Sequence, residues 1–235
     1  RNISPADVRV SSALQRVLRP AGPNCFWMNL QSLTATNLTC LRGGRLVFRD
    51  LSFAVERGQA LSLEGANGAG KSSLLRMIAG FLTPAAGTLI ARTNDAEIAD
   101  AEDRGKCIGW LGHLDAAKPQ MTVRETLAFF ASFYASGASA SAIVAALDRV
   151  GLTRLADLPC QYLSMGQKKR LALARLVLSN RPLWLMDEPL AALDTSGKTI
   201  VADLVTTHCK TGGLAILATH EPLGIDSTRL TLGAA

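Results

Sequence analysis

The chain contains the stretch Gly65-Ala66-Asn67-Gly68-Ala69-Gly70-Lys71-Ser72, which fits the phosphate-binding pattern G-x-x-x-x-G-K-[ST] at every specified position. Residues 60–64 before it predict a short strand, and residues 72–80 after it carry apolar side chains at helical spacing. Glycines let the backbone of such a loop turn its amides toward an anion, and the helix N-terminus adds partial positive charge. We therefore expect a site for nucleotide phosphates. The alternative is a flexible Gly/Ala loop before an ordinary helix.

Three side chains give this loop its expected chemistry. The Lys71 ammonium would contact the β- and γ-phosphates of ATP, and the Ser72 hydroxyl would be a ligand of Mg²⁺. Ser73 follows in the first turn of the predicted helix and belongs to the same expected cofactor-binding set. The sequence thus predicts ATP and Mg²⁺ as cofactors, and Lys71 is also counted among the catalytic residues.

Length and composition are those of a chain with a substantial core. It has 235 residues, of which 48% are hydrophobic, and this length allows one large domain or two small ones. One nucleotide-binding domain with an inserted subdomain is the simplest interpretation. No apolar run approaches the roughly 18 residues that a membrane-spanning helix needs, so any membrane role is expected to depend on a partner.

Cysteine usage and charge argue against other classes of protein. The five cysteines are odd in number, scattered and without a C-x-x-C pair, which favours reduced thiols in a cytosolic protein over disulfides or metal ligands. The net charge is +6, and residues 1–27 contribute half of it with four arginines and one aspartate. An excess this small does not indicate a nucleic-acid-binding surface, so no nucleic-acid partner is expected.

The N-terminal part divides at about Met28. Residues 1–27 are basic, contain three prolines and lack sustained hydrophobic periodicity, so we expect a poorly ordered leader or a targeting peptide. The functional domain would then occupy residues 28–235.

Short β-rich segments surround the phosphate loop in the sequence. Residues 30–56, interrupted by Gly43-Gly44, often alternate apolar and polar side chains and predict antiparallel strands flanking the strand before the loop. Two more strands are predicted at 87–91 and 106–111. Between them, residues 93–105 are acidic and are expected to form a loop.

Residues 115–165 are predicted to form a mostly helical inserted subdomain. Thr122 and Glu125 have the spacing of a capping box at the start of one helix, and residues 139–150 predict a second helix. The insertion would separate two α/β portions of the chain.

The C-terminal part alternates helices and strands. Residues 183–186 and 214–218 are apolar without alternation, which is typical of parallel strands buried on both faces. Helical segments at 164–179 and 195–209 precede them. The expected fold class is therefore α/β, with a helix-covered parallel sheet, an antiparallel β subdomain and the inserted helical subdomain.

Two acids follow the first of these apolar runs. Asp187 and Glu188 stand at the end of a predicted buried strand, which is where open α/β sheets bind their ligands. Asp187 would hold Mg²⁺, and Glu188 would polarise the water that attacks the γ-phosphate. The alternative is a pair of solvated acids at the end of a strand.

A second phosphate-binding end is predicted at the start of the helix 164–179. Ser164 and Gln167 have capping-box spacing, which by itself indicates only a well-started helix. A serine hydroxyl, the Gly166 amide and a helix N-terminus would also bind phosphate. Two such ends in one chain imply that two polypeptides share each nucleotide.

Together these motifs resemble the ATP-binding-cassette (ABC) ATPases over residues 28–225. His220 follows the apolar run 214–218 and resembles the switch histidine of the family, which contacts the γ-phosphate. The resemblance implies a P-loop NTPase fold with a RecA-like sheet, and a head-to-tail homodimer. The residues that resemble the signature and the end of the D-loop, and that would bind ATP, are Ser164, Met165, Gly166, Gln167 and Asp194.

The chain departs from the family pattern at two positions. Leu114 stands where a glutamine usually contacts the metal and the attacking water, and leucine can do neither. Either His113 or Gln120 substitutes for it, or coupling to the membrane subunit is weakened. Arg42 aligns near the aromatic residue that usually stacks on adenine; its guanidinium plane would stack there instead, with Phe48 as an alternative.

Within the family, the chain most resembles the ATP-binding subunits of the haem exporters of cytochrome c maturation. The stretches that carry this likeness are 37–45, 64–71, Gly112-His113, Lys118-Pro119 and 182–189. The resemblance implies ATP hydrolysis on the cytoplasmic face of the inner membrane, coupled to an integral-membrane permease that contacts residues 112–135. The alternatives are the ATPase subunit of another ABC transporter with different cargo, or a non-transport P-loop nucleotide-binding protein.

Overall fold

The computed structural model describes residues 29–112, 117–133 and 139–233. The predicted leader at 1–27 lies outside these residues, as do His113 and Leu114. Within them, none of the helices combines the length and the apolar character needed to cross a bilayer.

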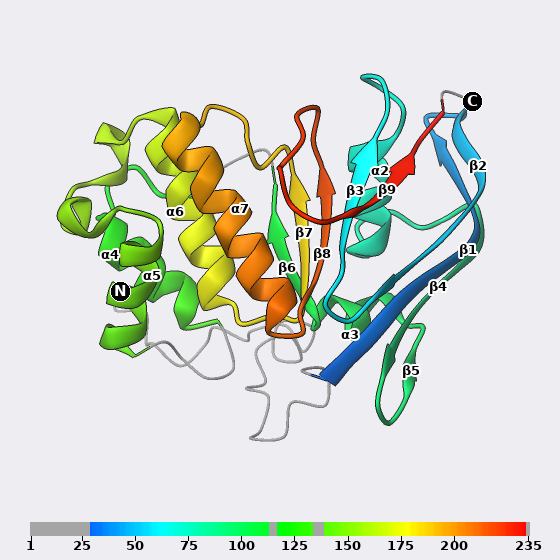
Figure 1. Cartoon of the computed structure of the whole chain (residues 1–235), viewed down its shortest axis with the longest axis horizontal. Helices are drawn as coiled ribbons and strands as arrows, with labels where there is room; N and C mark the ends of the chain where they lie inside the picture. The colour runs from blue at the N-terminus through cyan, green and yellow to red at the C-terminus, as the bar shows by residue number, and fades with distance from the viewer. Residues whose placement is uncertain (1–28, 113–116, 134–138, 234–235) are drawn as a thin grey trace, which may run out of the picture.

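A parallel sheet forms the centre of the molecule (Figure 1). Its strand order is β6-β7-β8-β3-β9, and every neighbouring pair is parallel. Leu183 and Leu185 of β7 pack into one hydrophobic cluster, while Trp184 and Met186 pack into another. The unbroken apolar run therefore buries both faces of the strand, as predicted. The strands are β3 (Ala60–Glu64), β6 (Ile108–Leu111), β7 (Leu183–Asp187), β8 (Leu214–Ala218) and β9 (Thr228–Thr231).

The antiparallel strands form a second, separate sheet. Its order is β2-β1-β4-β5, whereas among the described residues β3 pairs with β8 and β9 alone, so the prediction that antiparallel strands flank β3 is wrong. The reason is burial: β3 is covered on both faces, while β2 alternates exposed and covered residues and suits a sheet with one solvated face. The strands are β1 (Leu30–Arg42), β2 (Arg45–Glu56), β4 (Ala86–Thr93) and β5 (Glu97–Ile98).

The acidic segment 93–105 is not a plain loop, and that prediction is also wrong. It contains β5 and the short helix α3 (Ala101–Gly105). Asp100 caps α3 by accepting hydrogen bonds from the backbone N–H groups of Glu102 and Asp103. Acidic residues are favoured at this end of a helix, so the composition that indicated a loop was a helix-start signal.

The remaining helices lie in layers on the two faces of the parallel sheet (Figure 1). Helix α2 lies between the two sheets and its buried side chains join the cluster that both sheets share. Helices α6 and α7 cover the opposite face, and α4 and α5 lie beyond α6. The helices are α2 (Lys71–Ile78), α4 (Val123–Ala131), α5 (Ala140–Arg149), α6 (Met165–Leu178) and α7 (Thr195–Lys210), with short 3-10 turns at Thr153–Leu155 and Cys160–Tyr162.

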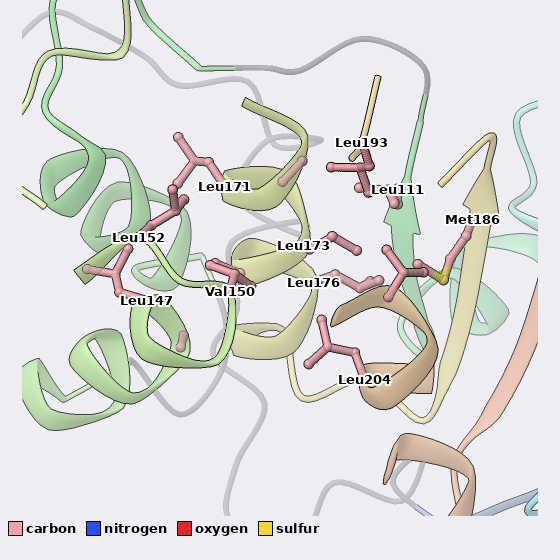
Figure 2. Packing of buried hydrophobic residues seen from close by; sticks show 14 of the residues in the cluster. Leu111, Leu147, Val150, Leu152, Leu171, Leu173, Leu176, Met186, Leu193 and Leu204 are labelled. Atoms are coloured by element: carbon pink, nitrogen blue, oxygen red, sulfur yellow. The ribbon is translucent and has the colours of Figure 1, made fainter. Parts of the chain in front are cut away.

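Helix α6 is enclosed by apolar side chains from both directions (Figure 2). Leu173 and Leu176 lie in a cluster with Met186 of β7 and Leu204 of α7, and Val150 contributes to it from the end of α5. A helix buried on most sides is held rigidly, because each neighbour constrains it. Both predicted capping boxes, at Thr122/Glu125 and Ser164/Gln167, are confirmed.

The structure describes four of the five cysteines, and none of these is in a disulfide. Cys40, Cys107 and Cys160 are buried, and Cys209 is half-buried. Burial raises the pKa of the Cys107 and Cys209 thiols to about 11. These two side chains therefore stay protonated and unreactive at neutral pH.

His208 ties the last turn of α7 to the parallel sheet. Its ring stacks on Trp184 of β7, with centroids 3.9 Å apart and planes at 6°. Its Nε2 lies 3.1 Å from the carbonyl oxygen of Pro182 and 3.2 Å from that of Leu214. Because both oxygens only accept, Nε2 carries a proton and donates to them. Burial lowers the pKa of His208 to about 4, and the two carbonyls oppose this shift.

This depressed pKa predicts acid sensitivity. The unfolded chain takes up the proton near the ordinary histidine pKa of about 6.5, and the folded chain only near pH 4, so stability present above pH 6.5 is lost as the pH falls through that window. The loss amounts to about 3 kcal/mol. Urea unfolding from pH 7 to 4 should show a shallower pH dependence for His208→Gln, which keeps an N–H donor and cannot titrate. If the free energy of unfolding fell equally with pH in the wild type and in His208→Gln, this account would be contradicted.

Candidate nucleotide-binding site

The phosphate loop joins β3 to α2, and two of its three glycines, Gly65 and Gly70, lie in close contact with neighbouring segments. Gly70 precedes α2 with a φ of 101°. A Cβ at this position would lie 2.6 Å from Cγ1 of Val47 and 3.0 Å from Cδ1 of Phe48, both in β2. At Gly65 a Cβ would lie 2.5 Å from the carbonyl oxygen of Leu232. The loop is therefore packed between the antiparallel sheet and the C-terminal segment, and larger residues do not fit.

Lys71 points back into its own loop. Its side chain is buried, and its Nζ donates hydrogen bonds to the carbonyl oxygens of Gly65 at 2.7 Å and Ala66 at 3.2 Å. Two carbonyl acceptors offset part of the cost of burying the ammonium. The loop thus curls around a cation, and a phosphate oxygen can replace a carbonyl as the partner of that cation.

Ser72 and Asp187 bring oxygen atoms together from α2 and β7. The Ser72 hydroxyl donates a hydrogen bond of 2.9 Å to Oδ1 of Asp187, which is buried at the end of β7. Mg²⁺ prefers oxygen ligands and is often bound by one or two protein groups together with phosphate and water. These two side-chain oxygens fit that requirement, and their role as Mg²⁺ ligands stays a prediction.

Glu188 and His220 face each other at the ends of β7 and β8. His220 Nε2 lies 3.3 Å from Oε1 of Glu188, and both side chains are partly open to solvent. Glu188 has a φ of 49°, an uncommon value for a residue other than glycine, and its N–H donates to the carbonyl oxygen of Ala218 at 2.9 Å. This strained turn directs the carboxylate toward His220. Such strain is often found at functional sites.

Most of the predicted ATP-site residues on the β3 and β7 side line one cleft of about 440 Å³, whereas Gly65, Ala66, Ala69 and Asp187 are not part of its lining. Arg42 reaches it from the end of β1, whereas Phe48 is buried against Gly70, so the structure removes Phe48 as the alternative adenine contact. Val47 was missed by the sequence reasoning; the Gly43-Gly44 turn, which folds β2 back beside Arg42, was the available signal. The cleft is lined by Arg42, Val47, Asn67, Gly68, Gly70, Lys71, Ser72, Ser73, Glu188 and His220.

The predicted signature residues lie in a different cleft, of about 480 Å³. Ser164 accepts a hydrogen bond from the N–H of Gln167, and the Gln167 side chain accepts one from the N–H of Ser164. This cleft shares no lining residue with the first, so one chain does not bring the two sets together. Its lining is Gly151, Leu152, Leu155, Ser164, Met165, Gly166, Gln167, Arg170, Ala192 and Asp194.

Gly166 has a structural role that the sequence did not reveal. A Cβ there would lie 2.9 Å from the carbonyl oxygen of Ala192. Ala192 itself has a φ of 63°, in the left-handed region. Arg170, also missed from sequence, donates a 2.7 Å hydrogen bond to Asp194. The start of α6 is thus packed closely against the segment before α7.

Comparison with known proteins places these clefts in a family. Residues 48–191 match the family model described as ABC transporter. An ABC transporter ATP-binding protein from Pyrococcus furiosus superposes with a TM-score of 0.76 at 25% identity, covering 86% of this chain and 97% of its own. The chain therefore belongs to the ABC transporter family, and the predicted P-loop fold class and family resemblance are confirmed.

Within the family, similar curated proteins from several bacteria carry the same name. The chain is 47% identical over 203 residues to the cytochrome c biogenesis ATP-binding export protein CcmA of Rhodopseudomonas palustris (strain BisB5), covering 86% of this chain and 98% of the relative. CcmA of Paramagnetospirillum magneticum is 44% identical over 200 residues, covering 84% and 92%. A bacterial Atm1-family ABC exporter with ATP bound shares the fold at a TM-score of 0.74 and 24% identity, covering 87% of this chain and 37% of its own.

The Gly166 contact predicts a stability cost for a methyl group. Gly166→Ala would press a Cβ against the Ala192 carbonyl and should lower the free energy of unfolding by about 1–2 kcal/mol, as overpacking does. Gly105→Ala, at the end of α3, has no heavy atom within 4 Å of the added Cβ and is the matched control. Urea denaturation of both variants measures the difference. Equal midpoints would show that the contact relaxes without cost.

Proposed function

We propose that the chain is the ATP-hydrolysing subunit of a membrane ABC transporter, the haem exporter used in c-type cytochrome biogenesis. The observation that carries the proposal is the likeness, over nearly their whole length, to proteins named for ATP-binding export in cytochrome c biogenesis. The cleft that contains Lys71, Ser72, Glu188 and His220 supports it, because these groups suit phosphate binding and water activation.

Each group in the cleft would have one task. Lys71 would exchange a loop carbonyl for phosphate oxygens and neutralise their charge. Glu188 would accept a hydrogen bond from the attacking water and orient it, and His220, 3.3 Å from Glu188, would contact the γ-phosphate and fix the carboxylate. Mg²⁺, held by Ser72 and oriented by Asp187, would offset negative charge that develops on the phosphates.

Recognition of the nucleotide base would fall to Arg42. It lines the same cleft from the tip of the β1–β2 hairpin, and its planar guanidinium can stack on adenine. The buried position of Phe48 leaves Arg42 as the proposed adenine contact.

The separation of the two clefts supports a head-to-tail homodimer. The phosphate loop and the signature helix each present backbone N–H groups and a helix N-terminus, yet they open into different clefts of one chain. Two copies facing in opposite directions would close both sites by the same contact, because a twofold interface is self-complementary. ATP would join the copies, and hydrolysis would release them.

The membrane partner would bind at α4. Phe129 is exposed on this helix and Phe133 just beyond its end, with ring centroids 5.0 Å apart, and Lys118 Nζ lies 5.5 Å from the Phe129 ring. Exposed aromatic groups are typical anchors of protein interfaces. We place the subunit on the cytoplasmic face of the inner membrane, bound there through the permease. The second candidate is an ATPase subunit with another cargo.

Mixed variants test both the catalytic assignment and the dimer. Lys71→Ala should abolish phosphate binding, and Ser164→Asp should repel the phosphate while keeping a good helix cap. Each variant alone should lose ATP hydrolysis, since every site of its dimer is damaged. A one-to-one mixture should regain roughly a quarter of wild-type turnover, because random pairing leaves one site in four with both parts intact.

A phosphate-release assay measures this recovery. Recovery in the mixture requires sites built from both chains, and a mixture no more active than its components would contradict the head-to-tail arrangement. Full activity of Lys71→Ala alone would overturn the assignment of the phosphate loop.

Replacing the two exposed aromatic residues, Phe129 and Phe133, tests the proposed contact with the membrane partner. Phe129→Ser with Phe133→Ser should reduce recovery of membrane proteins with the tagged chain by roughly tenfold, since buried aromatic anchors carry much of the binding energy. Val144→Ser, at an exposed apolar residue of α5, is the matched control. Recovery of cytochrome-maturation membrane proteins with the wild type is the expected result. Recovery of a nutrient permease instead would show a different cargo.

A further inference from the structure

The segment that carries His220 has few backbone contacts of its own. In the described part of the chain, residues 220–225 lie outside the helices and strands and make no backbone–backbone hydrogen bond. The Thr219 hydroxyl donates to the carbonyl oxygen of Glu221 at 3.0 Å and accepts from its N–H at 3.2 Å, so these residues form a tight turn. Segments with so few backbone hydrogen bonds open easily, and side-chain contacts decide where they lie.

One ion pair fastens this turn to α7. Lys198 Nζ contacts Oε2 of Glu221, the residue that follows His220. Lys198 lies in the first turn of α7, where its N–H donates to the carbonyl oxygen of Asp194 at 2.9 Å. The first turn of a well-capped helix is a firm support, because Asp194 also accepts a hydrogen bond of 2.8 Å from the N–H of Gly197.

The same helical turn is fixed to α6 on its other side. Arg170 Nη2 donates to Oδ1 of Asp194 at 2.7 Å. Together with the Gly197 N–H, which is the larger cause, this contact lowers the pKa of the Asp194 carboxyl. A carboxylate held in this way stays ionised and keeps the start of α7 fixed against α6.

From these contacts we infer that Lys198 and Glu221 form a positioning pair that holds His220 against Glu188. The inference rests on the proposed ATP hydrolysis and names two residues that act through His220 without touching substrate. The pair is partly exposed, with side-chain exposures of 38% and 58%, so it adds little to global stability. Its effect is local, because the turn it holds has no backbone ladder to replace it.

The position of the pair has a consequence for the dimer. Contacts in one chain run from Arg170 through Asp194 to Lys198 and then to Glu221, beside His220. In a head-to-tail dimer, Arg170 lies at the cleft that serves one ATP and His220 at the cleft that serves the other. The first turn of α7 therefore joins the two sites.

A double-mutant cycle tests the pair. Lys198→Ala and Glu221→Ala should each lower the single-turnover rate of ATP cleavage about three- to fivefold, the range an exposed pair permits. The double variant should be no slower than either single variant, because both changes remove one interaction. The exchange Lys198→Glu with Glu221→Lys should restore the rate to within about twofold. ATP affinity should stay unchanged throughout.

Arg92→Ala is the matched control, since it removes another partly exposed ion pair, with Glu97 in the antiparallel sheet. Unchanged rates, multiplicative losses in the double variant, or failure of the exchanged pair to recover would each overturn the inference.

An NMR readout keeps the inference separate from the proposed function. The imidazole signal of His220 should shift in Lys198→Ala and in Glu221→Ala, return in the exchanged pair, and stay in place in Arg92→Ala. The half-buried His208 is an internal reference, because its described partners are Trp184, Pro182 and Leu214. A His220 signal that does not respond overturns the positioning role. A different result would separate the two ideas: the His220 signal shifts in both variants, but the wild-type protein does not cleave ATP. That result would support the positioning pair and refute the proposed function.

Discussion

Parallel pairing of β3, β8 and β7 is the constraint on which the rest of the structure depends. Leu63 pairs with Ala218, and Ala218 pairs with Asp187, so three segments far apart in sequence leave the sheet at one level. The phosphate loop, His220 and Glu188 begin within two residues of this row. Because strands of opposite direction would send these groups to opposite edges, the chemistry of the cleft follows from strand direction before any side chain is considered.

Burial on both faces of the sheet makes the paired strand ends of β3, β8 and β7 rigid. They can therefore hold buried charges and a strained backbone. Lys71 and Asp187 are each only 6% exposed, and Glu188 has a left-handed backbone. Each of these features costs free energy, and each persists because local partners oppose the cost: loop carbonyls for Lys71, the Ser72 hydroxyl for Asp187, and the Ala218 carbonyl for the N–H of Glu188. The apolar core on either side gives these polar contacts a fixed frame, so ligand groups are oriented before a ligand arrives.

Sequence reasoning succeeded where a signal is local and failed where packing decides. The capping box at Ser164 and Gln167 spans three residues, and the apolar run of β7 is read directly from its letters. The separation of the two sheets was missed, because pairing partners are not encoded in the alternation of one strand. The contact of Gly166 with the Ala192 carbonyl joins residues 26 positions apart, so no local pattern could predict it. Roles in binding and catalysis stay predictions; what the structure adds is that most of the predicted residues on the β3 and β7 side line one cleft.

In the proposed dimer, the division of the expected site into two clefts would also account for the thorough enclosure of α6. A helix end that completes a neighbour's site must keep its direction while the neighbour is absent, and apolar contacts on several sides of α6 provide this without any ligand. The phosphate loop meets the same requirement differently, by curling around Lys71. The phosphate loop and the start of α6 are therefore each held in place within a single chain. What each lacks is the opposing charge and the hydrogen-bond donors of the other. In the proposed dimer, two preformed halves would place the free-energy gain of ATP binding at the contact between chains, where it would drive a change in their relative position.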